Sequence, residues 1–214
     1  MKSGMPASTD TSQINGERYP TLTVPSIGPW PRFDSPLRIG VMASGSGTNF
    51  EALQAAITAG DLDAEVRLLV VNRPGCGAMA RAERLGIPCE LIDHRRFPSR
   101  EALDHQLVST FRAAGVEALV MAGWMRIVTP VLIDAFPRKL INIHPSLLPS
   151  FKGMDAVGQS LDAGVCLAGC TVHEVMKDVD AGPILAQAAV PILPGDDREA
   201  LAARIQREEH RLLP

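Results

Sequence analysis

Five short apolar runs, separated by longer amphipathic stretches, constrain the fold of this chain more than any other feature. The runs lie at 38–43, 65–71, 88–92, 117–122 and 139–144. Strands that alternate with helices in this way are typical of β-α repeats, which assemble into a mainly parallel sheet. We therefore predict an α/β fold with a mainly parallel central sheet and helices on both faces.

The stretches between these runs carry signals for helix starts and stops. In the first stretch, 49–59, apolar residues recur on one face and Gly60 follows as a stop. Ser99 can cap a second helix that runs to Ala113, and Thr129 followed by proline starts a third. After about residue 165 the rhythm changes, and the sequence predicts an antiparallel pair over 166–175 and 183–190 and a last helix over 196–213.

Residues 1–36 differ from the rest of the chain. They contain six prolines among scattered serines and threonines, and they lack the apolar segment of a secretory signal. A chain of 214 residues fits one domain of ordinary size together with a tail. We predict a disordered Pro/Ser-rich tail over 1–36 and a single domain over 37–214.

Composition limits the classes of partner. The 21 basic and 24 acidic residues are mixed along the chain and give a net charge of −3, which argues against nucleic acid and membrane surfaces and favours small molecules. The four cysteines have no CxxC spacing, so we expect them to be reduced and buried and predict no metal site. Because no apolar run is long enough to span a bilayer, we expect a cytoplasmic protein.

A glycine-rich loop, Ser44-Gly-Ser-Gly-Thr-Asn49, lies between the first predicted strand and the first helix. Backbone N–H groups and the positive end of a helix can surround a phosphate at such a position. The loop is not a Walker A motif, and Phe50 occupies the third glycine position of the dinucleotide fingerprint. A tight turn that binds nothing also fits. Asn72-Arg73 after the second strand leaves a nicotinamide enzyme as a weaker alternative.

Two polar residues interrupt the last apolar run. The period of two sends Asn142 and His144 to the same face of a strand that Pro145 ends. Ligands collect beyond the carboxyl ends of such strands, where histidine can exchange a proton with an amine and an amide can donate to an oxyanion. The pair could instead only satisfy loop carbonyls. Asp180, before Ala-Gly, fits a turn, and spacing does not connect it to His144.

Several motifs together resemble one known family. They are Ser-Gly-Ser-Gly-Thr-Asn (44–49), Phe-Pro-Ser-Arg-Glu (97–101), Ala-Gly-Trp-Met-Arg-Ile (122–127), Asn-Ile-His-Pro-Ser-Leu-Leu-Pro (142–149) and Val-Asp-Ala-Gly-Pro-Ile (179–184). Their order and spacing, from about residue 37 to the end, are similar to those of the phosphoribosylglycinamide formyltransferases. The resemblance implies the formyltransferase fold, with a Rossmann-like amino-terminal half.

The resemblance also implies roles for individual residues. At the reacting centre, Asn142 would hold the formyl oxygen, His144 would be the acid-base group, and Asp180 would raise the basicity of the histidine or order a water. The residues implied for the ribonucleotide are Gly47, Thr48, Asn49 and Glu209. Those implied for the folate are Arg100, Met125, Arg126, Ile127, Val128 and Asn142.

The implied reaction moves a formyl group from 10-formyltetrahydrofolate to the amine of N1-(5-phospho-D-ribosyl)glycinamide, the third step towards IMP in de novo purine biosynthesis, without metal or ATP. A formyltetrahydrofolate hydrolase and a non-catalytic phosphoribosyl-binding module are the alternatives, and monomer and homodimer both remain open. The resemblance breaks at Phe151–Asp155 and at Pro214, where relatives continue, so we expect a truncated carboxyl-terminal end.

Overall fold

The computed structural model describes residues 8–14, 17–25 and 33–214. The described residues divide into two compact units. The parallel unit contains 33–142 and Glu174–Asp178, together with Pro214. The antiparallel unit contains the described residues up to 25 together with Ile143–His173 and Val179–Leu213.

The parallel unit has the predicted α/β architecture. Its strands lie in the order β7-β6-β3-β4-β5, and each neighbouring pair is parallel. Its elements are β3 (Leu37–Ala43), α1 (Thr48–Ala59), β4 (Ala64–Val71), α2 (Gly77–Leu85), β5 (Cys89–Leu91), η1 (His94–Arg96), α3 (Arg100–Ala113), β6 (Ala118–Met121), α4 (Pro130–Ala135) and β7 (Leu140–His144, of which Ile143 and His144 fall in the antiparallel unit). The five strands match the five apolar runs of the sequence to within a residue or two.

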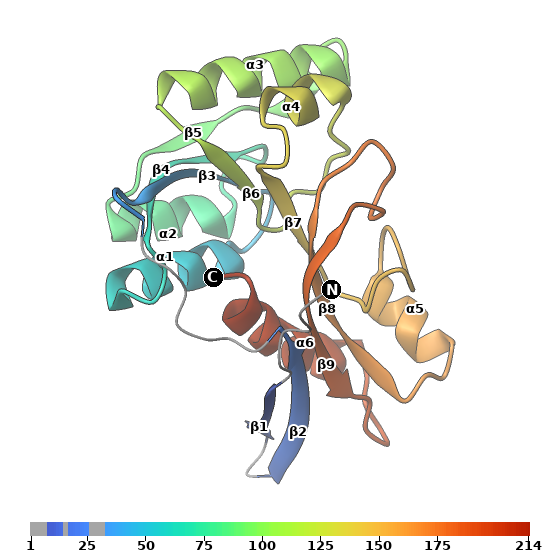
Figure 1. Ribbon diagram of the computed structural model, residues 1–214. Coiled ribbons are helices and arrows are strands. Elements are labelled where there is room, and N and C mark those ends of the chain that lie inside the picture. Colours follow the sequence, from blue (N-terminus) through green and yellow to red (C-terminus); the bar gives the residue numbers. More distant parts are fainter. Residues whose placement is uncertain (1–7, 15–16, 26–32) are drawn as a thin grey trace, which may run out of the picture. The chain divides into compact units, whose positions relative to one another are not determined.

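Alternation along the strands explains how helices cover both faces of this sheet. Met42 on β3 joins a buried cluster with Leu107 and Phe111 of α3. The residues beside it, Val41 and Ala43, point to the opposite face and are fully buried, on the side where α1 and α2 lie. Figure 1 shows α1 and α2 on one face and α3 and α4 on the other. The predicted helices on both faces are confirmed.

The helix ends follow the local signals in the sequence. Gly60 ends α1 in the left-handed conformation, with φ of 79°. The Ser99 hydroxyl accepts a hydrogen bond from the Ala102 N–H at the start of α3. The helix α2, which the sequence did not predict, buries only Ala78 and Ala82. Small side chains give a weak apolar period, so this helix was missed.

One glycine in β3 is required by packing. A Cβ atom at Gly40 would lie 2.6 Å from the Phe111 ring of α3 and 2.8 Å from the Leu119 side chain of β6. Contacts this short do not occur between real side chains, so Phe111 can seat on the sheet only because residue 40 has no side chain.

The antiparallel unit is built around strands in the order β1-β2-β9-β8, with each neighbouring pair antiparallel. Its elements are β1 (Ser8–Ile14), β2 (Glu17–Val24), α5 (Ala156–Asp162), β8 (Leu167–Glu174, of which Glu174 falls in the parallel unit), β9 (Ile184–Pro191) and α6 (Arg198–Leu212). The helix α6 packs against β9 and α5. The antiparallel pair and the last helix occur where the sequence predicts them, and α5 was missed.

The structure describes part of the range 1–36, which was predicted as a tail. In the described part of this range, β1 pairs with β2, and β2 in turn pairs with β9 through Leu22 opposite Ala189. The strand β2 thereby satisfies backbone groups at one edge of the antiparallel unit, which composition alone did not reveal. Residues 1–7, 15–16 and 26–32 lie outside the described residues.

A buried ion pair joins α6 to the loop before it. Arg204 donates from both terminal nitrogens to the Asp196 carboxylate, at 2.5 and 2.8 Å. The two side chains are only 3% and 6% exposed. The hydrogen bond from Arg204 lowers the pKa of Asp196, although burial acts in the opposite direction. This two-pronged pair fixes α6 to the loop that precedes it.

The cysteines only partly match their prediction. All four are free, and Cys170 is buried. Cys89 and Cys166, however, are exposed, because the first begins the edge strand β5 and the second lies just before β8. In the part of the chain that the structure describes, no helix combines the length and the apolar character needed to cross a membrane.

Candidate active site

Two histidines flank one aspartate in the antiparallel unit. His144 ends β7, His173 lies near the end of β8, and Asp180 follows in the loop before β9. The Nδ1 atom of His144 lies 3.4 Å from Oδ2 of Asp180, and Nε2 of His173 lies 3.6 Å from Oδ1. All three side chains are at least nine-tenths buried. One carboxylate therefore faces two imidazoles away from bulk water.

The Asp180 carboxylate is held by backbone as well as by side chains. The N–H of Gly153 donates to its Oδ2 at 2.8 Å. Burial acts to raise the pKa of Asp180, but the hydrogen bonds from His173 and Gly153 and the nearby charges of both histidines outweigh it and lower the pKa below its ordinary value. The backbone of Asp180 is left-handed, with φ of 48°. Aspartate tolerates this conformation better than most residues, which fits its place in a turn.

The second ring nitrogen of His144 faces another acceptor. Its Nε2 lies 2.9 Å from the carbonyl oxygen of Phe151, a residue with a left-handed backbone at φ of 55°. Because both neighbours of the ring are acceptors, an imidazolium donates to both, whereas a neutral ring donates to only one. His144 is therefore placed to hold a proton on either side, with Asp180 opposite Nδ1.

The structure adds His173, which the sequence analysis missed. His173 is 2% exposed and follows a run of buried, mostly apolar residues in β8, from Ala168 to Val172. A titratable side chain at such a position requires a polar partner, and this was the available signal. The link between Asp180 and the histidines could not be read from spacing, because Asp180 lies 36 positions after His144.

Asn142 and His144 are alternate residues of the single strand β7, so their side chains leave the strand on the same side. Asn142 belongs to the parallel unit and pairs with Met121 of β6 in the sheet register.

The glycine loop precedes α1 in the parallel unit. Gly47 is the N-cap residue of α1 and has a left-handed backbone with φ of 80°. A Cβ atom there would lie 2.6 Å from the Cα of Ala78, at the start of α2. Thr48 is the first residue of α1, and Asn49 is 9% exposed. The glycine at 47 is thus required by its conformation and by the close approach of α2.

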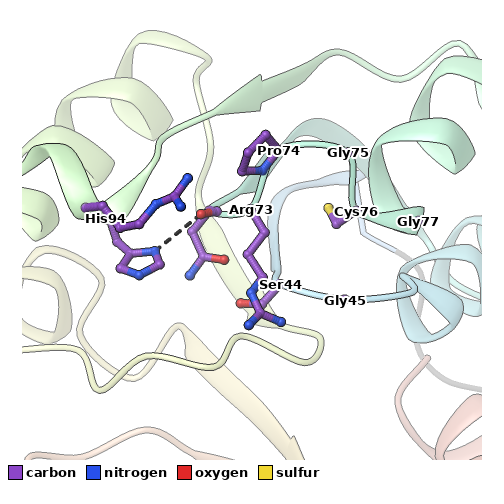
Figure 2. Close-up of a pocket in the computed structure, with 10 residues that line it drawn as sticks. Ser44, Gly45, Arg73, Pro74, Gly75, Cys76, Gly77 and His94 are labelled. Carbon is purple, nitrogen blue, oxygen red and sulfur yellow. Dashed lines mark hydrogen bonds between the residues drawn. The ribbon is translucent and has the colours of Figure 1, made fainter.

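A cavity of about 620 Å³ lies beside this loop, at the carboxyl ends of β3 and β4 (Figure 2). It is lined by Ser44, Gly45, Asn72, Arg73, Pro74, Gly75, Cys76, Gly77, His94 and Arg95. The predicted ribonucleotide residues Gly47, Thr48 and Asn49 are not in this lining. Two arginines and a histidine give the cavity a basic character, although Arg95 also binds the Asp93 carboxylate at 2.7 Å.

The segment predicted to line the folate pocket also lies in the parallel unit. Met125 and Ile127 are 66% and 52% exposed, and Arg126 is exposed between them. Val128 is only 7% exposed, so it can offer a ligand little besides its backbone. Arg100, the other predicted folate residue, is exposed at the first position of α3.

The last predicted ribonucleotide residue, Glu209, lies on α6 in the antiparallel unit and is 8% exposed. Within that unit the structure brings together His144 and Asp180. The other predicted residues belong to the parallel unit. Among the described residues, no three histidine, cysteine or acidic side chains are grouped in a way that could hold a metal ion.

Comparison with known proteins gives the family. A model of the formyl transferase family matches residues 37–214. The phosphoribosylglycinamide formyltransferase of Bacillus subtilis is 40% identical over 177 residues, which cover 83% of this chain and 91% of that protein. The trifunctional purine biosynthetic protein adenosine-3 of Drosophila melanogaster is 42% identical over 179 residues. The chain spans 13% to 20% of the length of the trifunctional proteins that it matches.

Solved structures agree with this assignment. The glycinamide ribonucleotide transformylase 1 of Symbiobacterium toebii has a TM-score of 0.83 and 44% identity, covering 85% of this chain and 86% of that one. The corresponding protein of Geobacillus kaustophilus has a TM-score of 0.81 and 44% identity, covering 84% and 95%. The chain therefore belongs to the formyl transferase family, among its phosphoribosylglycinamide formyltransferases.

Proposed function

We propose that this chain transfers the formyl group of 10-formyltetrahydrofolate to the amine of glycinamide ribonucleotide, a step of purine biosynthesis. The observation that carries the proposal is the buried contact between His144 and Asp180 in a chain of this family. A histidine oriented by a carboxylate is suited to moving a proton between an attacking amine and a leaving amine.

The proposed reaction balances without a further reactant. The glycinamide nitrogen forms a bond to the formyl carbon, and the bond from that carbon to N10 of the folate breaks. One proton leaves the amine and one reaches N10, and His144 carries it between them on Nε2, which exchanges its contact with the Phe151 carbonyl for the substrate. Asn142 donates a hydrogen bond to the formyl oxygen while that oxygen bears negative charge. No step requires ATP or a metal ion.

Asp180 and His173 support the proton carrier. Asp180 fixes the orientation of the His144 ring and stabilises its protonated form, as a carboxylate does for a catalytic histidine in other enzymes. His173 holds the opposite oxygen of Asp180 at 3.6 Å, and the Gly153 N–H donates to the nearer one. The carboxylate is thereby kept in one orientation.

The remaining residues divide between the two substrates. We assign Gly47, Thr48, Asn49 and Glu209 to the ribonucleotide, and Arg100, Asn142 and the segment Met125–Val128 to the folate. A phosphate at the N-terminus of the twelve-residue helix α1 would face backbone N–H groups and the positive end of the helix. The exposed apolar side chains of Met125 and Ile127 offer contact area to a pteridine ring.

Two alternatives lead to different measurements. A formyltetrahydrofolate hydrolase would use the same histidine and aspartate with water as the acceptor. A non-catalytic phosphoribosyl-binding module would keep the glycine loop without using His144. The identity to proteins named as phosphoribosylglycinamide formyltransferases favours transfer over both.

The experiment is an assay of tetrahydrofolate release from 10-formyltetrahydrofolate, with and without glycinamide ribonucleotide. We expect release only when the ribonucleotide is present. Equal release without it would indicate the hydrolase. His144→Ala should lower turnover by roughly 10²–10⁴-fold, the usual contribution of general acid-base catalysis. His105→Ala, which changes an exposed histidine of α3, is the matched control and should leave turnover unchanged.

We further propose that the partners are these two small molecules rather than nucleic acid or membrane, that the protein works in the cytoplasm, and that it is a monomer or a homodimer. Full activity after dialysis against EDTA, in buffer without ATP, would support the metal-free and ATP-free reaction. Sedimentation of the purified chain would decide between monomer and dimer.

A further inference from the structure

The folate segment Met125–Val128 has no regular structure of its own. It follows β6 and precedes α4, so neither a sheet ladder nor a helix fixes its backbone. Three consecutive residues, Met125, Arg126 and Ile127, nevertheless present exposed side chains on it. A segment of this kind can line a ligand site only if other groups hold its backbone in one conformation.

The start of the segment is held by Ser44. The ladder between β3 and β6 continues beyond the strands, because the Ala122 N–H donates to the Met42 carbonyl and the Ser44 N–H donates to the Gly123 carbonyl. Gly123 then turns the chain with φ of 83°, a conformation that favours glycine. Past this turn the Met125 N–H donates to the Ser44 hydroxyl oxygen at 2.9 Å. The serine side chain thus takes the place of a strand carbonyl.

The end of the segment is held by Asp104. The N–H of Thr129, the residue directly after the segment, donates to Oδ2 of Asp104 at 2.5 Å. Asp104 lies on α3 and is 1% exposed. Burying a carboxylate this deeply costs free energy unless it is hydrogen-bonded. The hydrogen bond from the Thr129 N–H therefore compensates for the burial of Asp104 on α3. The Thr129 carbonyl in turn accepts from Leu132 and Ile133 at the start of α4.

Apolar side chains complete the attachment. Trp124, directly before Met125, and Val128, the last residue of the segment, are 6% and 7% exposed and belong to the same buried cluster. The backbone is therefore pinned on both sides of the three exposed side chains, by one apolar anchor and one side-chain acceptor at each end. The three exposed side chains therefore extend from a backbone that is held in place on both sides.

We infer that Ser44 and Asp104 are positioning residues for the folate, which hold the segment Met125–Val128 in its ligand-lining conformation through the N–H groups of Met125 and Thr129. This inference rests on the proposed function, because it takes the segment to be the folate-lining one. Neither residue touches the reacting atoms. Their loss should therefore weaken folate binding while leaving ribonucleotide binding and the chemical step nearly intact.

The first test compares variants of Ser44. Ser44→Ala removes the acceptor of the Met125 N–H, whereas Ser44→Thr keeps a hydroxyl at the same position. We expect Ser44→Ala to raise KM for 10-formyltetrahydrofolate about tenfold, the order expected for one lost hydrogen bond, with kcat changed less than about twofold. Ser44→Thr should restore most of the loss. Ser160→Ala, which removes a buried hydroxyl of α5 far along the chain, is the matched control and should leave both constants unchanged.

The second test compares variants of Asp104. Asp104→Asn keeps an oxygen that can accept from the Thr129 N–H, and we expect folate KM within about threefold of the unaltered chain. Asp104→Ala removes the acceptor and should raise folate KM about tenfold or more. Because this variant also loses stability, Leu53→Ala serves as a destabilised control: it opens a cavity under α1 and should lower the melting temperature without changing folate KM.

Direct binding measurements distinguish a failure of the positioning role from a failure of the proposed function. Folic acid, which carries no transferable formyl group, and glycinamide ribonucleotide are each titrated by calorimetry into every variant. Weaker folic acid binding in Ser44→Ala and Asp104→Ala, with unchanged ribonucleotide binding, supports the positioning role. Unchanged folic acid binding in both variants overturns it while leaving the proposed function intact. If the unaltered chain neither binds folic acid nor transfers the formyl group, the proposed function fails and the positioning role fails with it.

Discussion

His144 Nδ1 and Asp180 Oδ2 lie 3.4 Å apart, with both side chains less than a tenth exposed. Away from bulk water, a carboxylate at this distance fixes the orientation of an imidazole more firmly than an exposed one would. The same carboxylate is also held by His173 and by the backbone of Gly153, so its own position is constrained. This contact is the basis of the first three predictions.

Asp180→Asn should lower kcat by roughly 10²–10⁴-fold, because the amide cannot balance the charge of a protonated His144 ring. Ribonucleotide binding should persist, since the change is nearly isosteric. Steady-state kinetics and calorimetric titration check the two parts. Asp178→Asn, which alters an exposed aspartate of the same loop, is the control and should behave like the unaltered chain. Comparable activity in both variants would remove Asp180 from the mechanism.

His173→Ala should move the acid limb of the kcat profile to higher pH. The hydrogen bond from His173 is one of the causes that lower the pKa of Asp180, so its loss lets that pKa rise towards the ordinary value. Activity that needs ionised Asp180 is then lost at a higher pH than before. A profile that extends down to pH 3 tests this shift, which loss of packing alone would not produce. An acid limb that stays in place would contradict the role given to His173.

Asp180 should also contribute to stability in a pH-dependent way. Its pKa is lower in the folded chain than the unfolded value of about 3.9, so its contribution is present above that value and is lost as the pH falls through the folded pKa. The difference in unfolding free energy between the unaltered chain and Asp180→Asn should therefore shrink below about pH 4. Urea unfolding at pH 7, 4 and 3 measures it. A constant difference over this range would refute the expectation.

Gly47→Ala should lower the unfolding free energy by about 1–3 kcal/mol, because alanine is strained at φ of 80° and its Cβ would meet the backbone of Ala78 at 2.6 Å. Gly45→Ala is a closely matched control in the same loop. Its Cβ would meet nothing within 4 Å, so its effect should stay within about 0.5 kcal/mol. Equal losses in the two variants, measured by denaturant unfolding, would show that the contact with α2 is not what requires glycine.

Arg204→Met should cost about 3–5 kcal/mol of stability, because it leaves the Asp196 carboxylate buried without its charge partner. The double variant Arg204→Met with Asp196→Leu should regain much of this loss, since no unpaired charge remains. Arg67→Met removes an ion pair with Glu65 in which both side chains are about half exposed, and it should cost less than about 1 kcal/mol. Thermal and urea unfolding of the three variants compare buried with exposed charge.

The parts of the fold that could be predicted from sequence are those with strong local patterns. The five apolar runs predicted the parallel strands, and Gly60, Ser99 and Pro130 marked helix ends because their effect on the backbone is local. The helices α2 and α5 were missed, since they bury small residues such as Ala78 and Gly158 whose apolar period is weak. The strand β2 was missed because its pairing with β9 is not a local property.

In the candidate site, too, local relationships could be predicted from the sequence and non-local ones could not. The shared face of Asn142 and His144 could be predicted because it depends only on the period of a strand. The approach of Asp180 to His144 depends on the path of the loop before β9, where Asp180 itself has a left-handed backbone, and no spacing rule describes that path. The roles of Ser44 and Asp104 depend on backbone N–H groups 81 and 25 positions away along the chain. Only the folded backbone shows which side chain accepts a hydrogen bond from each of these N–H groups.

The contact between the glycine loop and the first turn of α2 determines which positions can be varied independently. A Cβ at Gly47 would meet Ala78, and a Cβ at Gly77 would lie 2.8 Å from the Ser46 carbonyl oxygen. The two loops therefore pack against each other with no room for a side chain at either glycine. Neither Gly47 nor Gly77 can be given a larger side chain without a shift in the facing loop. Libraries that vary position 47 should therefore recover folded variants more often when the first turn of α2 is varied with it.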